Sequence, residues 1–435
     1  MSLSLAASCS FALLSSLAVP PQQPNDAGKP TWTRERAIAA LRSDSAAEQF
    51  VAAQQLEYYG PAVLADLRTL RDDTNDPALR SRIENVLGGI ELQHPGGLVV
   101  VFPRGEIIRN ELWAWRDGQE IALTANTTME ADLALAPDGR HLLFSTTPDH
   151  HDFGVHDLHV IELATGKEVL KDRGHGGTFS PDGVHAAILR QDGLVLRELG
   201  RDQERRLAPE LGEVREAQWS PNGRFLAVVS GGDVVVLEAT TGAVHARLDS
   251  TPPGTSTMAS FALGDSVVSL VSGNGPYEWD LFVVPVGGGE AQKRTERSFQ
   301  HGMASLAPDG KRALLLQSRP TPPRREGEPP MEPGTGASHG YAASLLELDG
   351  DGEPRLVFGS ANPLLRPTWS PEGRFVVFVD EGGNLQLLHV RSGRTRKLAK
   401  MDVGYGPSTT SFAPAVWFAQ GRPMPAFRGI APAAK

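Results

Sequence analysis

The residues with the clearest potential for chemistry lie in one short, histidine-rich segment. A zinc or nickel ion could take imidazole and carboxylate ligands from His150, His151, Asp152 and His156, and His159 follows three residues later. Nothing in the spacing fixes a coordination geometry, and such tracts are typical of solvated surface loops. We therefore predict a loop without a bound metal, its imidazoles mostly exposed on a rim of the fold. These four residues remain the candidates for a metal site.

A second motif fits the nucleophile pattern of α/β-hydrolases. Residues 336–340 read Gly-Ala-Ser-His-Gly, which would make Ser338 the nucleophile. That pattern works only when a strand precedes the serine and a helix follows it, because the sharp turn between them exposes the hydroxyl. Here a proline-rich stretch precedes the motif, and residues 341–435 are too few for a hydrolase domain. We predict a loop, no catalytic residue and no cofactor.

Composition limits the classes of partner. The chain has 435 residues, of which 40% are hydrophobic and 22% charged, as in a soluble globular protein. The net charge of -10 argues against nucleic acid, which requires a basic surface, and no window beyond the N-terminus is apolar enough for stable membrane insertion. The 46 glycines and 33 prolines favour a fold with frequent tight turns.

The N-terminus predicts export. An apolar run from Leu3 to Ala18 is typical of a signal peptide, although no Lys or Arg precedes it. We assign residues 1–18 to this segment and 19–30 to a linker, and expect a periplasmic or secreted protein. The alternative is an apolar N-terminus on a cytosolic protein. Cys9 is the only cysteine, so the processed chain would have no thiol.

Residues 31–92 show a helical apolar period. A capping box opens one predicted helix at Ser45, and Asp76-Pro77 opens another. The stretches that begin at Gly60 and Asp76 resemble a HEAT-type repeat. Three such repeats are usually needed for an independent solenoid. We therefore expect a small cap of four helices packed on its neighbour, with a partner-binding solenoid fragment as the alternative.

Beyond residue 97 the apolar period becomes two, and one turn motif recurs. A large apolar residue is followed by Ser or Ala, Pro, an Asp-like residue and Gly, the composition of a type I turn. The prolines of the five copies are Pro137, Pro181, Pro221, Pro308 and Pro371. Turn chemistry alone explains the Asp-like residues, which we do not assign to calcium or catalysis. The aromatic residues before the turns (Phe179, Trp219, Trp369 and, one period later, Phe412) predict packing between repeats.

The spacing of the motif predicts the architecture. Pro137 and Pro181 are 44 residues apart, and Pro181 and Pro221 are 40 apart. Units of this length with four strands are the blades of a β-propeller. We predict a mainly β fold of seven blades, with six or eight as alternatives, over residues 95–418. Residues 98–126 and 408–418 should share the blade that closes the ring, and 319–339 form a Pro-rich insertion before a tail at 419–435.

The turn motif, the Asp-Leu-x-Val strand at Asp157 and Asp280, and the Thr-Gly turns at Thr165 and Thr241 resemble TolB-type and WD40-like propellers. The resemblance spans residues 95–418 and is closer to the TolB side, because the Gly-His and Trp-Asp marks of WD40 blades are nearly absent. It implies a propeller that serves as a binding platform.

These observations favour an exported, non-catalytic scaffold that binds a protein or peptide partner. We expect a monomer. One alternative is an enzyme with its site in the central channel, such as a propeller hydrolase or lactonase. Another is a metal-responsive sensor that uses the cluster around His150. A fold of this kind identifies neither the partner nor the face that binds it, because its function depends on the surface groups that it carries.

Overall fold

The computed structural model describes residues 30–418 except for 107–108, 126–127, 148–155, 249–254, 263–265, 273–278, 296–302, 320–339, 351–352, 361–364, 381 and 402–414. The predicted signal peptide, the linker up to residue 29, the loop with His150, His151 and Asp152, the motif around Ser338, Phe412 and the tail lie outside the described residues. The chain falls into two compact units, residues 1–59 and 60–435.

The first unit contains helices α1 (Arg34–Ala40) and α2 (Ala46–Tyr59). Thr33 caps α1 by accepting the backbone N–H of Arg36 at 3.3 Å. At α2, the Ser45 hydroxyl accepts the backbone N–H of Glu48 at 3.4 Å, which is one half of the predicted capping box. The Glu48 carboxylate instead accepts a bond from the Ser43 hydroxyl at 2.5 Å.

The second unit begins with a 3-10 turn (Gly60–Val63) and helices α3 (Leu64–Asp73) and α4 (Pro77–Gln93). Asp76 caps α4 by accepting the backbone N–H of Ala78 at 2.9 Å, and Pro77 occupies the first turn, where its missing N–H costs nothing. None of the described helices is long and apolar enough to cross a membrane.

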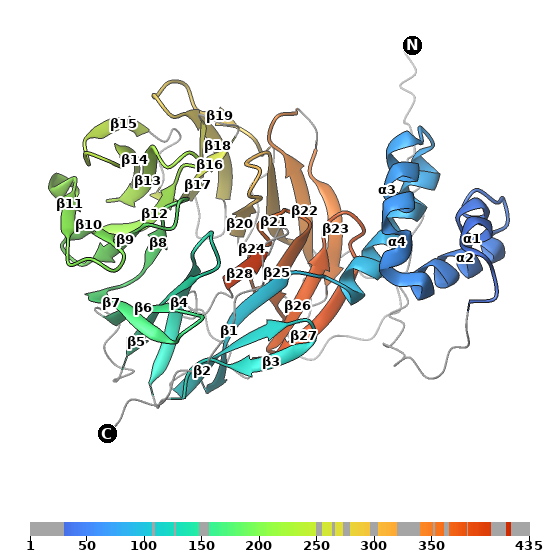
Figure 1. Cartoon of the computed structure of the whole chain (residues 1–435). Helices are drawn as coiled ribbons and strands as arrows, with labels where there is room; N and C mark the ends of the chain where they lie inside the picture. Colours follow the sequence, from blue (N-terminus) through green and yellow to red (C-terminus); the bar gives the residue numbers. More distant parts are fainter. Residues whose placement is uncertain are drawn as a thin grey trace, which may run out of the picture. The chain divides into compact units, whose positions relative to one another are not determined.

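Seven four-stranded antiparallel sheets follow, which we number as blades 1 to 7 (Figure 1). Blade 1 contains β1 (Leu98–Glu106), β2 (Arg109–Arg116), β3 (Gln119–Ala122) and β28 (Ala415–Phe418). Blade 2 contains β4 (Met129–Leu135), β5 (His141–Thr147), β6 (His156–Glu162) and β7 (Lys167–Gly174). Blade 3 contains β8 (Gly177–Phe179), β9 (His185–Arg190), β10 (Gly193–Glu198) and β11 (Glu204–Leu207), and a 3-10 turn (Pro209–Leu211) follows it. Blade 4 contains β12 (Val214–Trp219), β13 (Phe225–Ser230), β14 (Asp233–Glu238) and β15 (Val244–Leu248).

The remaining blades keep the same order. Blade 5 contains β16 (Thr255–Ala262), β17 (Ser266–Ser272), β18 (Trp279–Pro285) and β19 (Gln292–Lys293). Blade 6 contains β20 (Met303–Leu306), β21 (Arg312–Arg319), β22 (Gly340–Glu347) and β23 (Arg355–Ser360). Blade 7 contains β24 (Leu365–Trp369), β25 (Phe375–Val379), β26 (Asn384–His389) and β27 (Thr395–Lys400). The prediction of a seven-bladed propeller is confirmed.

The ring closes as the sequence predicts. Strand β28 pairs antiparallel with β1, from Leu98 opposite Phe418 to Val101 opposite Ala415. A C-terminal strand is thus the innermost strand of a blade whose other three strands come from the start of the propeller (Figure 1). It contacts the inner strands β24 and β4 of the blades on either side. This pairing covers the edge of β1, which would otherwise be free to pair with another chain.

Burial follows a strand's position within its blade. Every residue of the second strands β13 and β25 is buried, whereas the outer strands β11 and β15 are mostly exposed. Second strands are covered on both faces by neighbouring blades, and they are therefore continuously apolar. One cluster of buried apolar side chains lies at each of the seven interfaces between blades. Phe179, Trp219 and Trp369 belong to these clusters, which confirms their predicted packing role.

The recurring motif forms the predicted tight turn between first and second strands. In blade 4, the backbone N–H of Gly223 bonds to the carbonyl of Ser220 at 2.9 Å, and Gly223 has φ of 72°. Asn222 Oδ1 accepts the backbone N–H of Arg224 at 2.9 Å. Asp138, Asp182 and Asp309 make the same contact two residues on. The predicted structural role of the Asp-like residues is confirmed at these positions.

Helix α4 packs on the outer side of blade 7, against β26 and β27. Arg396 donates to the carbonyl of Leu92 at 2.9 Å, and Arg394 donates to that of Asn85 at 3.1 Å. Leu92 also belongs to the buried cluster between blades 7 and 1. The last carbonyls of α4, those of Leu92 and Gln93, are therefore satisfied by Arg396 of the propeller.

Candidate functional site

The described part of the histidine-rich segment differs from its prediction. His156 is only 8% exposed, and its Nδ1 bonds to the Thr147 hydroxyl. His159 Nε2 lies 2.9 Å from the Thr146 hydroxyl, and its Nδ1 lies 2.6 Å from Glu168 Oε2. The expectation of exposed imidazoles is thus wrong for these two, because they lie on the regular strand β6 and not in the loop. Among the described residues, no three potential ligands gather around one point.

A buried polar cluster joins α4 to blade 7. His389 Nε2 lies 3.2 Å from Glu91 Oε2, and His389 Nδ1 lies 2.9 Å from the Ser392 hydroxyl. Arg68 contacts the same carboxylate at 2.6 Å, and Arg374 at 3.4 Å. Burial would raise the pKa of Glu91, but the bonds from His389 and Arg68 and the charge of Arg374 outweigh it and lower that pKa to about 2.

The chain Ser392–His389–Glu91 has the connectivity of a hydrolase triad, but helix α4 lies against it. A Cβ atom on Gly88 of α4 would overlap both Ser392 Oγ and His389 Nδ1. The serine hydroxyl therefore lies directly beside the helix backbone, which leaves little room there for an acyl group. The cluster instead fixes the helix to the propeller.

The best candidate for a binding site is a cavity of about 500 Å³ between blades 3 and 4. Its floor is apolar, formed by Leu196, Trp219 and Ala239, each less than 9% exposed. Its rim comes from the turn between β8 and β9, the turn between β12 and β13, the end of β14 and strand β11. A volume of this size and an apolar floor with a polar rim are typical of ligand sites.

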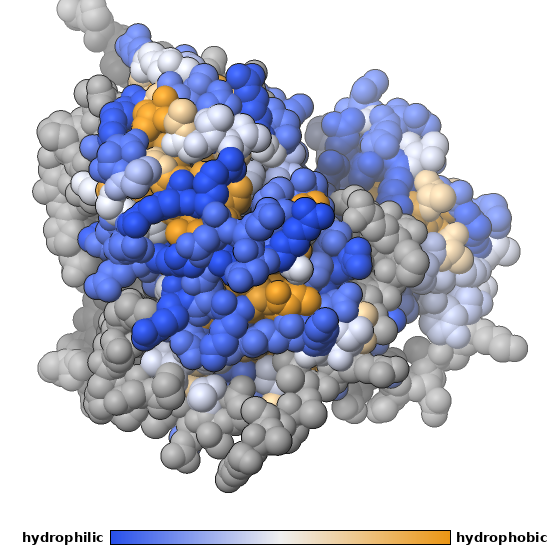
Figure 2. All heavy atoms as spheres, turned by 60° about the vertical axis from the view of Figure 1, so that its left-hand side comes forward, coloured by the Kyte–Doolittle hydropathy of each residue, from blue (hydrophilic) through white to orange (hydrophobic). Residues whose placement is uncertain are grey.

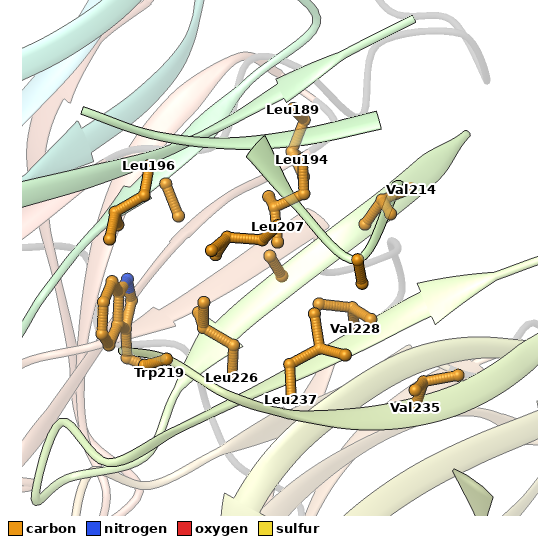
Figure 3. Close-up of a cluster of buried hydrophobic side chains, with 14 residues drawn as sticks. Leu189, Leu194, Leu196, Leu207, Val214, Trp219, Leu226, Val228, Val235 and Leu237 are labelled. Carbon is orange, nitrogen blue, oxygen red and sulfur yellow. The ribbon is translucent and has the colours of Figure 1, made fainter. Parts of the chain in front are cut away.

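Trp219 is the least expected member of this site. Its indole nitrogen is buried and has no hydrogen-bond partner within the described part of the chain. In Figure 3 the nitrogen lies on the side of the ring turned toward Leu196, and both residues line the cavity. Trp369 occupies the same repeat position in blade 7, and its nitrogen donates to the carbonyl of Ser305 on blade 6 at 2.9 Å. A buried unpaired N–H is costly, and Trp219 bears this cost whereas Trp369 does not.

One repeat position explains why the cavity is open here. Between blades 6 and 7, the Arg312 guanidinium lies over the Trp369 ring, 5.4 Å from its centroid, and donates to the carbonyl of Gly373 at 3.2 Å. The corresponding residue of blade 3, two after the turn glycine, is His185. The shorter imidazole lines the cavity and does not fill the space above Trp219.

The rim carries one group of each charge. The bond from the Ser180 hydroxyl lowers the pKa of Asp182 more than burial raises it, and the backbone N–H of Val184 adds to the effect. Arg205 on β11 is exposed and donates to the carbonyl of Ala239 at 3.2 Å. On the face in Figure 2, where the left side of Figure 1 comes forward, hydrophobic residues show only in short strips among hydrophilic ones.

A further ionisable group lies on an inner strand. Glu216 on β12 is half-buried, and burial raises its pKa to about 8, although the backbone N–H of Ala259 on the next blade opposes this shift. Carboxyls with such pKa values act as proton donors in some enzymes.

Sequence reasoning identified Trp219 only as a packing residue and did not select His185, Arg205 or Glu216. Aligning the five turns would have shown the signal, since the residue two after the glycine is Phe, Arg or His in different blades.

Comparisons with known proteins support the propeller fold and assign no activity. No family model matches the sequence, and no curated protein matches it. An oligogalacturonate lyase solved in complex with manganese is similar over 71% of this chain and 86% of its own, with a TM-score of 0.51 and 12% identity. TolB from Acinetobacter baumannii is similar over 79% of this chain and 74% of its own, with a TM-score of 0.43 and 16% identity.

A third similar structure is the β-propeller domain of Cps50 (Swd1) from Myceliophteria thermophila. It covers 63% of this chain and 87% of its own, with a TM-score of 0.44 and 12% identity. TolB and WD40-type propellers are thus both among the structural neighbours, together with an enzyme. At this level of identity the likeness shows a shared propeller fold alone.

Proposed function

We propose that this chain is a non-catalytic β-propeller that binds a protein or peptide segment in the cavity between blades 3 and 4. The observation that carries the proposal is the cavity of about 500 Å³ itself, with its apolar floor and polar rim. A bound segment would place an apolar side chain on this floor and its backbone N–H and carbonyl groups at the rim.

The polar rim supports a peptide over a purely apolar ligand. Arg205 and Asp182 place a donor and an acceptor of hydrogen bonds beside the apolar floor. A peptide offers the same mixture, with carbonyl and N–H groups beside side chains that can fill the floor.

The test is binding of the purified full chain to an array of random eight-residue peptides. We expect a subset to bind, and His185→Arg to abolish that binding, because an arginine there should cover Trp219 as Arg312 covers Trp369. Val184→Arg is the matched control. It adds the same charge one residue away, at a side chain that is 43% exposed and outside the cavity. Absence of binding, or equal loss in both variants, would refute the proposal.

We also propose that the protein is exported to the periplasm or secreted. The support is the apolar run from Leu3 to Ala18, which has the composition of a signal peptide. N-terminal sequencing of the protein purified from an envelope fraction tests this. A mature chain that starts near residue 19 supports export, whereas an intact Met1 in the cytosolic fraction contradicts it.

An enzyme with its site near the inner strands is the second candidate, and Glu216 favours it. A carboxyl with a pKa of about 8 keeps its proton at neutral pH and could act as a general acid. A screen of glycoside, lactone and ester substrates with the wild type and Glu216→Gln tests this. Turnover that falls at least about a hundredfold in the variant would establish the enzyme, given the usual size of acid–base contributions.

A further inference from the structure

We infer that the cavity between blades 3 and 4 receives the last residue of a peptide, with an apolar side chain on the floor and the terminal carboxylate at Arg205. This inference rests on the proposed peptide-binding function and narrows it to one end of the chain. It follows from which polar atoms of the cavity are already used.

The groups left over for a ligand are mainly donors. Asn222 Oδ1 accepts bonds from Arg224 N at 2.9 Å and from the Ser220 hydroxyl at 2.8 Å, which leaves the amide NH₂ as the group a ligand can use. Arg205 donates one N–H to the carbonyl of Ala239, which leaves four of its five N–H donors for a ligand. The indole N–H of Trp219 is buried and adds no donor to the cavity surface.

Acceptors are fewer on the same lining. Asp182 Oδ1 already takes the Ser180 hydroxyl and the backbone N–H of Val184 at 3.0 Å. Its second oxygen remains for one ligand donor. A donor-rich site with a guanidinium favours a carboxylate, because charge-assisted bonds to arginine are the strongest available.

The apolar floor restricts what carries that carboxylate. Leu196, Trp219 and Ala239 form a buried apolar surface within the same cavity, so the carboxylate must be attached close to an apolar group. The last residue of a peptide has this arrangement, and its backbone N–H suits the remaining oxygen of Asp182. A free organic acid shares the carboxylate and apolar group but lacks that N–H.

The experiment uses pentapeptides with four random residues followed by Leu, Phe or Trp, each as free acid and as C-terminal amide, measured by calorimetry. We expect the amides to bind the wild type about tenfold more weakly or worse, the usual effect of losing a bond between charged groups. Arg205→Gln should reduce this preference to near one. 4-Methylpentanoic, 3-phenylpropanoic and indole-3-propanoic acids keep the carboxylate and the apolar group of Leu, Phe and Trp but lack the N–H, and they should bind more weakly than the pentapeptides.

The outcomes separate this inference from the proposed function. If acids and amides bind equally and His185→Arg abolishes both, the cavity binds peptides but not their ends, and the inference is wrong. If no peptide binds, both fail. A preference for acids that persists in Arg205→Gln also contradicts the inference. Should His185→Arg fold poorly, Thr240→Arg replaces it, because Thr240 is an exposed residue of the rim.

Discussion

Trp219 and Trp369 occupy the same position of two repeats, yet only Trp369 donates its indole N–H, to the carbonyl of Ser305 at 2.9 Å. The two rings have similar burial, 8% and 6% exposed. The difference lies in the preceding blade, where Arg312 covers one ring and His185 leaves the other beside a cavity. The side chain at this repeat position thus decides whether the tryptophan of the next blade is covered or borders a cavity.

We expect Trp219→Phe and Trp369→Phe to differ in their effect on the stability of the fold. Trp369→Phe removes a made hydrogen bond to the Ser305 carbonyl, whereas Trp219→Phe removes a donor that had no partner among the described residues. Both lose similar apolar area, so Trp369→Phe should be more destabilising by about 1 kcal/mol. Urea unfolding of the two variants measures this difference. An equal loss of unfolding free energy in the two variants would mean that the indole N–H of Trp219 has a hydrogen-bond partner in solution.

The low pKa of Glu91 predicts that the attachment of α4 to blade 7 weakens in acid. Its pKa of about 2 lies below the ordinary 4.5, so its ion pairs stabilise the fold above pH 4.5 and are lost as pH falls toward 2. Glu91→Gln should cost about 2 kcal/mol at pH 7, because Arg68 and Arg374, which are partly exposed, lose a charged partner, and it should remove this part of the acid sensitivity. Thermal midpoints from pH 2 to 7 measure both effects. Asp202→Asn, at a fully exposed carboxylate, should change little.

The raised pKa of Glu216 predicts that stability depends on pH in the opposite direction. Its pKa is about 8 in the folded chain and 4.5 ordinarily, so the folded state holds the proton more tightly. Stability should therefore fall as pH rises from 4.5 to 8, and Glu216→Gln should flatten this part of the profile. Thermal midpoints over this range test it, with the exposed Glu213→Gln as control. An unchanged slope in Glu216→Gln would contradict the assigned burial.

Gly88, which has no side chain, allows α4 to approach blade 7 closely. A methyl group there would overlap Ser392 and His389, so Gly88→Ala should destabilise the chain by about 1–3 kcal/mol, although alanine favours helices. Adding Ser392→Ala should recover part of this loss. Gly96→Ala is the control, because nothing lies within 4 Å of a Cβ atom there. A neutral or stabilising Gly88→Ala would show that the helix is not held so closely. Denaturant unfolding provides the comparison.

The fold could be predicted because its signal is local and repeated. Turns such as Ser220 to Gly223 combine proline, a short polar residue and glycine for reasons confined to four residues, and their spacing then gives the blades. Closure by residues 415–418 followed from the incomplete units at the two ends.

The site could not be predicted in the same way. The cavity depends on His185 and Trp219, which come from different blades and meet only in the folded ring. The helix attachment joins Glu91 to His389, 298 residues away. Neither pair has a spacing rule. The histidine-rich segment misled the exposure prediction because His156 and His159 belong to a strand covered by its neighbours.

The most direct test of the central claim is the indole N–H signal of Trp219 in ¹⁵N-labelled protein. The chain has seven tryptophans, and the signals of Trp219 and Trp369 are identified by their loss in the two Phe variants. On titration with the tightest-binding pentapeptide acid, we predict a saturable shift of the Trp219 signal, because the ligand packs against a side chain that lines the cavity, and no change at Trp369. Binding that leaves the Trp219 signal in place, or that shifts Trp369 instead, would contradict a site between blades 3 and 4.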